Sequence, residues 1–425
     1  MPETPYRTTC DCTAADFGPQ RKVPGLRQRV SLDRARFDPP RRWQASRTLT
    51  RFVGEFPFSD FVRGALQIEI YRDQPYTEEK NPTPLTTIEA YRDVAAVAAR
   101  FVREFVSLPW KYTLTVALPH HIGDFFRRTL TTYALSTSVR IVTPDEQFAA
   151  EYPPPPAPAG PLNFFRMAAL ADLMRGPKNE WDQNRTYLQV QVEGFIPMFG
   201  RTTPVEDGIG HVKSFFGLGI AHHLFDFERK FSEPPTKEDL WIHRSAGGKW
   251  EFENSIDLDR SVSSTLYGLA LNEAFAELKP DEQTIAFVKR TLDKIQPAFA
   301  ACAPSARILL ASQWHFESFG GSDEMLSYVQ AAVVLEILLG DKAASDAMGL
   351  GELLRNRCAY LISRSQAERE QVLRDFRGIY DVRSNIVHAG KKRLNNAEWR
   401  LFLRLRWFCQ RVIQEETKLL SGKRR

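Results

Sequence analysis

Long apolar runs are absent from this 425-residue sequence. No stretch approaches the ~20 apolar residues that span a bilayer, and the longest candidates are interrupted by charged residues. The first residues, Met1-Pro2-Glu3-Thr4, lack the basic segment and apolar core of a secretory signal. We therefore expect a soluble, cytoplasmic protein with no membrane partner.

Cysteine is also scarce, with five residues in the chain. Cys302, Cys358 and Cys409 fall in helical patterns and are predicted to be buried thiols. Cys10 and Cys12 lack the second pair that a zinc site needs. No Walker A, HExxH, EF-hand or nucleophile-elbow pattern occurs. The sequence thus indicates a reducing compartment, and we expect no metal and no cofactor.

A strong excess of charge of either sign is missing, since the net charge is only +5. This balance permits nucleic-acid binding without requiring it. Ten arginines and lysines lie between Arg21 and Arg51, against Asp33 and Asp38. This segment fits either a phosphate-binding surface or a solvated lead-in to the first domain.

The first 280 residues predict a mixed α/β region. Alternating or apolar runs predict strands at 65–71, 111–118, 138–142 and 186–195, a hairpin at 240–253, and helices at 87–106, 123–133 and 164–174. The helix at 87–106 would begin with a capping box of Thr86 and Glu89 and bury Val94, Val97, Phe101, Val102 and Phe105.

Proline is concentrated at 151–161, which fits a stiff linker or a long inserted loop. We therefore divide the region into a basic lead-in and mixed α/β domain at 1–151, a proline-rich segment at 152–161, and a β-containing region at 162–280.

From Asp281 onward the pattern becomes almost entirely helical. Helices are predicted at 281–295, 304–318, 323–339, 350–364, 367–389 and 395–419. The predicted fold class is therefore α+β, with a mixed α/β N-terminal region followed by an all-α bundle at 281–425.

The segment Tyr380 to Gly390, YDVRSNIVHAG, contains the most informative pair of residues. Arg383 and His388 are five apart, so on a helix they are ~7.5 Å apart along the axis and ~140° apart around it. Gly390 is a natural helix stop, and cations follow it where they favour the negative end of the helix dipole. The pair fits two cationic groups flanking a phosphate, or an arginine and a histidine that only cap a helix.

Three blocks in this order resemble a known family. They are Ala331 to Gly340 (AAVVLEILLG), Gly351 to Ile362 (GELLRNRCAYLI) and Tyr380 to Gly390. Together they resemble the Apea-like branch of the HEPN superfamily, over about residues 300–420, with its Arg-x4–6-His motif. Gly390 stands where the toxins paired with small nucleotidyltransferases usually carry tyrosine, so the sequence does not fit that branch.

The resemblance implies an all-α HEPN-like domain that cleaves RNA without a metal. It implies acid/base catalysis by His388 and phosphate binding by Arg383, with Ser384 and Asn385 orienting either group. Histidine suits proton transfer near neutral pH, and the planar guanidinium binds phosphate oxygens. Such sites commonly form at a dimer interface, so the implied partners are RNA and a second copy of the chain. Apea-like relatives are associated with antiphage or stress defence, with the N-terminal region as sensor or regulator.

Two alternatives stay open at this point. Glu336 lies in an apolar run, where burial of a carboxylate is costly without a partner. It is either a supporting residue paired with Arg383 or Arg357, or an exposed position on an amphipathic helix. The whole domain is either a nuclease or a non-catalytic RNA-binding or protein-interaction module of HEPN type.

Overall fold

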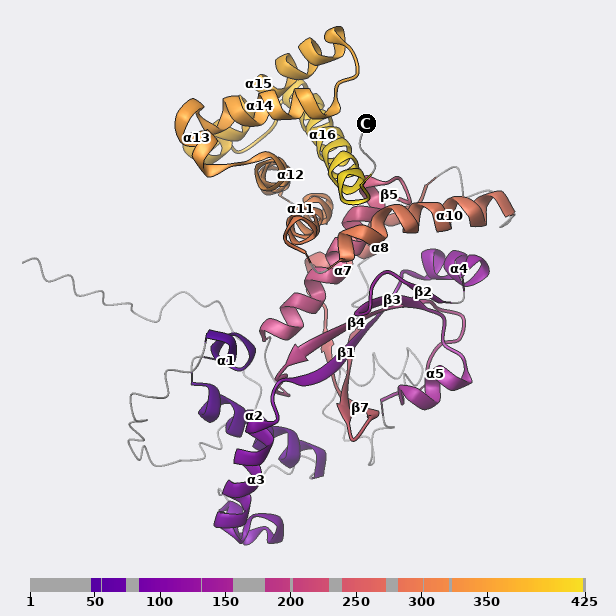
Figure 1. The fold of residues 1–425 in the computed structure, drawn as a ribbon, viewed down its shortest axis with the longest axis vertical. Helices are drawn as coiled ribbons and strands as arrows, with labels where there is room; N and C mark the ends of the chain where they lie inside the picture. Colours follow the sequence, from indigo (N-terminus) through magenta and orange to yellow (C-terminus); the bar gives the residue numbers. More distant parts are fainter. Residues whose placement is uncertain are drawn as a thin grey trace, which may run out of the picture.

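The structure is a computed structural model that describes residues 47–54, 56–73, 84–130, 132–155, 180–198, 202–228, 239–272, 282–300, 302–320 and 323–422. It has an α+β fold (Figure 1), in which a helical arm (helices between Arg47 and Val106), a central sheet and a group of C-terminal helices follow one another. The Cys10 and Cys12 pair, most of the basic segment at 21–51 and the helix predicted at 164–174 lie outside the described residues.

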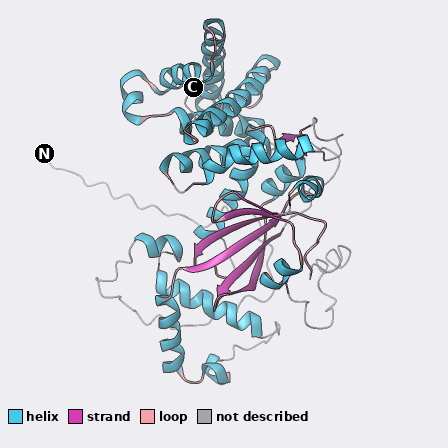
Figure 2. Ribbon diagram, turned by 45° about the vertical axis from the view of Figure 1, so that its right-hand side comes forward, coloured by secondary structure: helices cyan, strands magenta, loops and turns pink. Residues whose placement is uncertain are grey.

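Six antiparallel strands form the central sheet, in the order β2-β3-β4-β1-β6-β7. Their bounds are Trp110–Ala117 for β1, Thr132–Ala134 for β2, Val139–Val142 for β3, Tyr187–Gly194 for β4, Asp239–Ala246 for β6 and Lys249–Asp257 for β7. Strands from both sides of the proline-rich segment therefore pair in one sheet. Figure 2 shows this sheet between the helical arm and the C-terminal helices.

The predicted strands at 111–118, 138–142 and 186–195 and the hairpin at 240–253 are confirmed as β1, β3, β4 and β6–β7. In the register, Leu114 of β1 lies opposite Val190 on one side and Ile242 on the other, and all three are buried. A second, two-stranded sheet pairs β5 (Phe225–Phe227) with β8 (Leu269–Leu271).

The strand predicted at 65–71 is wrong, because these residues belong to helix α2, Pro57–Asp73. Phe61 and Ala65 are spaced i, i+4 and are both buried. They pack in one cluster with Phe101 and Phe195. This tertiary packing at helical spacing overrides the short alternation of apolar residues that follows Ala65.

The helix predicted at 87–106 begins later, as α3, Val94–Val106. Asp93 caps it by accepting a hydrogen bond from the N–H of Ala96 at 3.0 Å, and two 3₁₀ turns, Leu85–Thr87 and Glu89–Tyr91, precede it. Of the predicted inner face, Phe101 is buried, whereas Val94 and Val102 are exposed. The capping box was therefore assigned to the wrong turn.

Three short helices lie around the sheet and the helical arm. They are α1, Arg47–Phe52, α4, His120–Thr129, and α5, Glu146–Glu151. Helix α4 takes the place of the helix predicted at 123–133. It ends at Leu130, whose backbone is extended before β2.

The six predicted C-terminal helices are confirmed to within about two residues. They are α10, Glu282–Ile295, α11, Ala303–Gly320, α12, Glu324–Leu339, α14, Leu350–Ile362, α15, Gln366–Ala389, and α16, Asn396–Leu420. The structure adds α7, Thr203–Ala221, α8, Arg260–Gly268, the 3₁₀ turn η3, Gln296–Phe299, and α13, Lys342–Met348.

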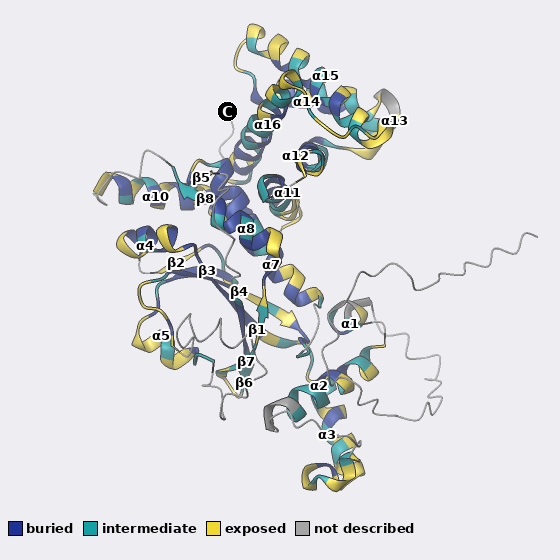
Figure 3. Cartoon of the chain, turned by 180° about the vertical axis from the view of Figure 1, so that it is seen from behind, coloured by how far each residue is buried: buried dark blue, intermediate teal, exposed yellow. Residues whose placement is uncertain are grey.

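Helix α7 joins the sheet to the C-terminal helices. It packs on β4 on one side and on α11 on the other. At Gly217 a Cβ atom would lie 1.9 Å from the carbonyl oxygen of Ser312, so only glycine permits this approach of the two helices. One continuous core therefore extends from the strands to α16, as the buried residues in Figure 3 show.

Candidate nucleic-acid site on helix α15

Local sequence signals fix both ends of α15. Ser365 caps the helix by accepting a hydrogen bond from the N–H of Glu368, whose carboxylate in turn accepts from the N–H of Arg364. The helix ends at Gly390, whose φ of 64° is left-handed and favours glycine. These two signals place Arg383 to His388 in the last turns of a 24-residue helix.

The inner face of α15 is apolar and holds the helix against its neighbours. Val372, Phe376, Ile379 and Val382 are buried, and the hydroxyl of Tyr328 on α12 donates to the carbonyl oxygen of Ile379 at 3.0 Å. Because this face is fixed by packing, the residues on the rest of the last two turns have defined positions.

Arg383 pairs with Glu336 of α12. The Nη2 atom of Arg383 lies 3.0 Å from the Oε1 atom of Glu336, and the two side chains are 20% and 21% exposed. The contact is an ion pair without hydrogen-bond geometry, because among the described residues neither Glu336 Oε1 nor Arg383 Nε has a hydrogen-bond partner. Arg357, the other partner considered from the sequence, instead donates to the carbonyl oxygen of Leu339 at 2.9 Å.

Sequence reasoning missed Tyr380, which completes this cluster. The guanidinium carbon of Arg383 lies 5.7 Å from the centre of the Tyr380 ring, and the ring packs over Gly351 of α14. Burial raises the pKa of Tyr380, and the charge of Glu336 raises it further. The signal was present in the sequence, because residues three apart on a helix share a face.

His388 and Asn385 are exposed, and Ser384 is half-buried. The carbonyl oxygen of Asn385 accepts hydrogen bonds from the N–H groups of Gly390 and Lys391 at the end of the helix. Across the described chain, no hydrogen bond or ion pair joins Arg383 to His388. The structure thus brings Arg383 and Glu336 together and leaves His388 apart from them.

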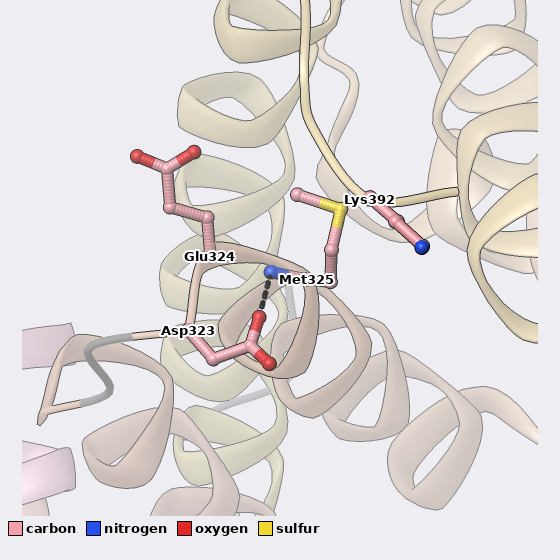
Figure 4. Close-up of a pocket in the computed structure, with 4 residues that line it drawn as sticks. All are labelled: Asp323, Glu324, Met325 and Lys392. Atoms are coloured by element: carbon pink, nitrogen blue, oxygen red, sulfur yellow. Dashed lines mark hydrogen bonds between the residues drawn. The ribbon is translucent and has the colours of Figure 1, made fainter. Parts of the chain in front are cut away.

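A cavity of about 410 Å³ lies where the segment after α15 meets the start of α12. It is lined by Asp323, Glu324, Met325 and Lys392 (Figure 4). Asp323 is occupied as the helix cap, accepting from the N–H of Met325 at 2.8 Å. Lys392 is therefore the side chain that brings positive charge to this hollow, four residues beyond His388.

The described residues hold no group of three or more histidine, cysteine, aspartate or glutamate side chains placed to bind a metal ion. Within those same ranges, no helix has the length and apolar character needed to cross a bilayer.

Comparison with models of known protein families, with curated proteins and with solved structures gives no significant match for this chain. The HEPN resemblance therefore remains a prediction from the three sequence blocks.

Proposed function

We propose that this chain is a metal-independent endoribonuclease with Arg383 and His388 as its catalytic residues. The observation that carries the proposal is the arrangement on α15, where His388 is exposed in the last turn and Arg383 is held by Glu336 about 7.5 Å back along the axis. A fixed cation and an exposed histidine on the same helix suit a reaction at a phosphodiester, and the Apea-like resemblance implies the same roles.

In the proposed reaction, His388 removes the proton from a ribose 2′-hydroxyl. The 2′-oxygen attacks the adjacent phosphorus, the bond from phosphorus to the 5′-oxygen breaks, and the 5′-oxygen takes a proton from the imidazolium or from water, giving a 2′,3′-cyclic phosphate and a 5′-hydroxyl. The guanidinium of Arg383 binds the non-bridging oxygens as their charge increases. Exposed Lys392 and Arg393 lie just beyond the helix, where they would attract the RNA backbone.

The proposal also requires a second copy of the chain. Arg383 faces α12, and no contact joins it to His388 within one described chain, so two copies arranged about a two-fold axis would complete one cleft. Glu336 would fix Arg383, and Ser384 and Asn385 would orient the catalytic groups. By the same resemblance, the protein would act in the cytoplasm in antiphage or stress defence, with the N-terminal region as sensor or regulator.

A non-catalytic RNA-binding or protein-interaction module is the second candidate. The observation that favours it is the Arg383–Glu336 ion pair, because an arginine neutralised by a carboxylate binds a phosphate less well. On this account the pair only ties α12 to α15.

The test is cleavage of 5′-labelled RNA by the full-length protein in EDTA, with analysis of the new ends and of the oligomeric state by light scattering. We expect 2′,3′-cyclic phosphate or 3′-phosphate ends and a dimer under active conditions. A strict requirement for a divalent metal would exclude the mechanism, and an active monomer would exclude the shared cleft.

A further inference from the structure

A second cavity, of about 400 Å³, lies between the helical arm and strands β1, β6 and β7 of the sheet. Ile68 and Glu69 of α2, Glu104 of α3, Trp110 of β1, Arg244 of β6 and Glu253 of β7 are among the residues that line it. The volume is at the lower end of the range for small-molecule sites. Its wall combines charged groups with apolar side chains, and it uses none of the residues of the α15 site.

Two of the three carboxylates at this cavity already have a cationic partner. The carboxylate of Glu69 accepts hydrogen bonds from Nη1 and Nη2 of Arg100, at 2.6 and 2.9 Å, and from the hydroxyl of Tyr91 at 2.8 Å. The Oε2 atom of Glu253 lies 3.3 Å from the Nε atom of Arg244. These two pairs balance their own charges.

Arg244 is fixed from a second side as well. Its guanidinium carbon lies 4.6 Å from the centre of the Trp110 ring, and the indole N–H of Trp110 donates to the hydroxyl of Ser107 at 2.8 Å. Arg244 is therefore held between an aromatic face and Glu253, and cannot turn to another carboxylate without losing both contacts.

Glu104 is the carboxylate that remains. Its side chain is half-buried, and among the described residues its carboxylate makes no hydrogen bond and no ion pair. Burial raises the pKa of Glu104 and the charge of Glu69 raises it further, while Arg100, Arg244 and Arg103 act in the opposite direction. The residues that line the cavity include three carboxylates and one guanidinium, that of Arg244, while Arg100 pairs with Glu69 from outside the lining and Arg103 is exposed on α3. A partly desolvated carboxylate is costly without a partner.

We propose that this cavity binds a small organic cation, with an amine or guanidinium group on Glu104 and a short apolar body against Ala65 and Ile68. A cation that donates hydrogen bonds would neutralise the remaining charge and satisfy the open carboxylate. An anion would meet Glu104 directly, and the arginines that would have to compensate are already engaged. The proposal concerns the N-terminal half and does not depend on nuclease activity.

The test uses the full-length protein and isothermal titration with agmatine and putrescine as probes. We expect one site per chain, and Glu104→Gln to weaken binding by about tenfold or more, because the neutral amide loses the charge interaction. Glu89→Gln is the matched control, since Glu89 is an exposed carboxylate on the turn before α3, and it should bind as the unsubstituted protein does.

Three results would overturn the proposal. The first is that neither probe binds at millimolar concentration. The second is that Glu104→Gln, shown by circular dichroism to be folded, binds agmatine unchanged. The third is that potassium or magnesium chloride at matched ionic strength displaces agmatine fully, because the cavity would then hold any cation.

Discussion

The two halves of the molecule each contain an arginine paired with a glutamate beside an aromatic ring. In the C-terminal helices, Arg383 lies 3.0 Å from Glu336, and in the sheet Arg244 of β6 lies 3.3 Å from Glu253 of β7. Each guanidinium also lies over an aromatic ring. The local chemistry of the two clusters is therefore nearly the same.

What differs is the group beside each pair. The helix that carries Arg383 ends with an exposed histidine, His388, which does not contact the pair, whereas the Arg244 cluster borders a cavity with an unpaired carboxylate, Glu104. Salt bridges of this kind are common structural contacts. The comparison shows that the two ion pairs by themselves do not distinguish the halves, so the proposals of RNA cleavage in one half and cation binding in the other depend on His388 and Glu104.

The largest expected change in stability comes from the core of α12, and it should be much larger than the change at the exposed His388. Leu335 is 2% exposed, so Leu335→Ala should lower the free energy of unfolding by roughly 2–5 kcal/mol. His388→Ala should change it by less than about 0.5 kcal/mol, because His388 is exposed. Urea denaturation measures both. Equal losses would show that His388 is part of the folded core.

The pH dependence of stability should come from buried histidines in both halves. Burial lowers the pKa of His243 in β6 to about 4. Burial, with a smaller contribution from the charge of Arg406, lowers the pKa of His315 in α11 to about 3. Between these values and the ordinary pKa of about 6.5, the unfolded chain binds more protons than the folded one. Stability should therefore be complete above about pH 6.5 and fall as the pH decreases, by up to about 1.4 kcal/mol per pH unit for each histidine.

Urea denaturation between pH 7 and 4.5 measures this slope (~1.4 kcal/mol per pH unit for each histidine). His315→Phe should flatten it, and His120→Phe should not, since His120 is exposed at the start of α4. An unchanged slope in His315→Phe would mean that the ring is solvated in the folded protein.

The Arg383–Glu336 pair should show coupling in a double-mutant cycle. Arg383→Ala should lower the free energy of unfolding by about 1–3 kcal/mol, because it leaves a half-buried carboxylate without its partner. Adding Glu336→Gln should recover part of this loss, with a coupling energy of at least about 0.5 kcal/mol. Strictly additive losses would indicate that the ion pair contributes nothing to the fold.

The smallest expected change in the free energy of unfolding comes from replacing a glutamate by glutamine, and its sign should differ between the two halves. Glu104→Gln should raise the free energy of unfolding near neutral pH, by less than about 1 kcal/mol, because an amide is less costly to desolvate than an unpaired carboxylate. Glu336→Gln should lower it, because Arg383 then loses its counter-charge. If both substitutions destabilise the protein, Glu104 is a paired structural residue.

The sequence predicted the C-terminal helices well because their apolar spacing is long and regular. It failed at α2, where the burial of Phe61 and Ala65 against Phe195 decides the structure and cannot be seen locally. It anticipated Arg383 as one possible partner of Glu336. It could not anticipate the cavity around Glu104, whose walls come from elements far apart in the chain.

The central claim is that His388 cuts RNA, and its most direct test is the cleavage rate of His388→Ala in EDTA beside His120→Ala. Both remove one exposed histidine, so they are matched in their expected effect on folding. The account predicts that His388→Ala is folded and loses ~10²–10⁴-fold in rate, while His120→Ala keeps the full rate. A folded His388→Ala protein that cleaves RNA at the unsubstituted rate would contradict the account, and the interaction-module function would replace it.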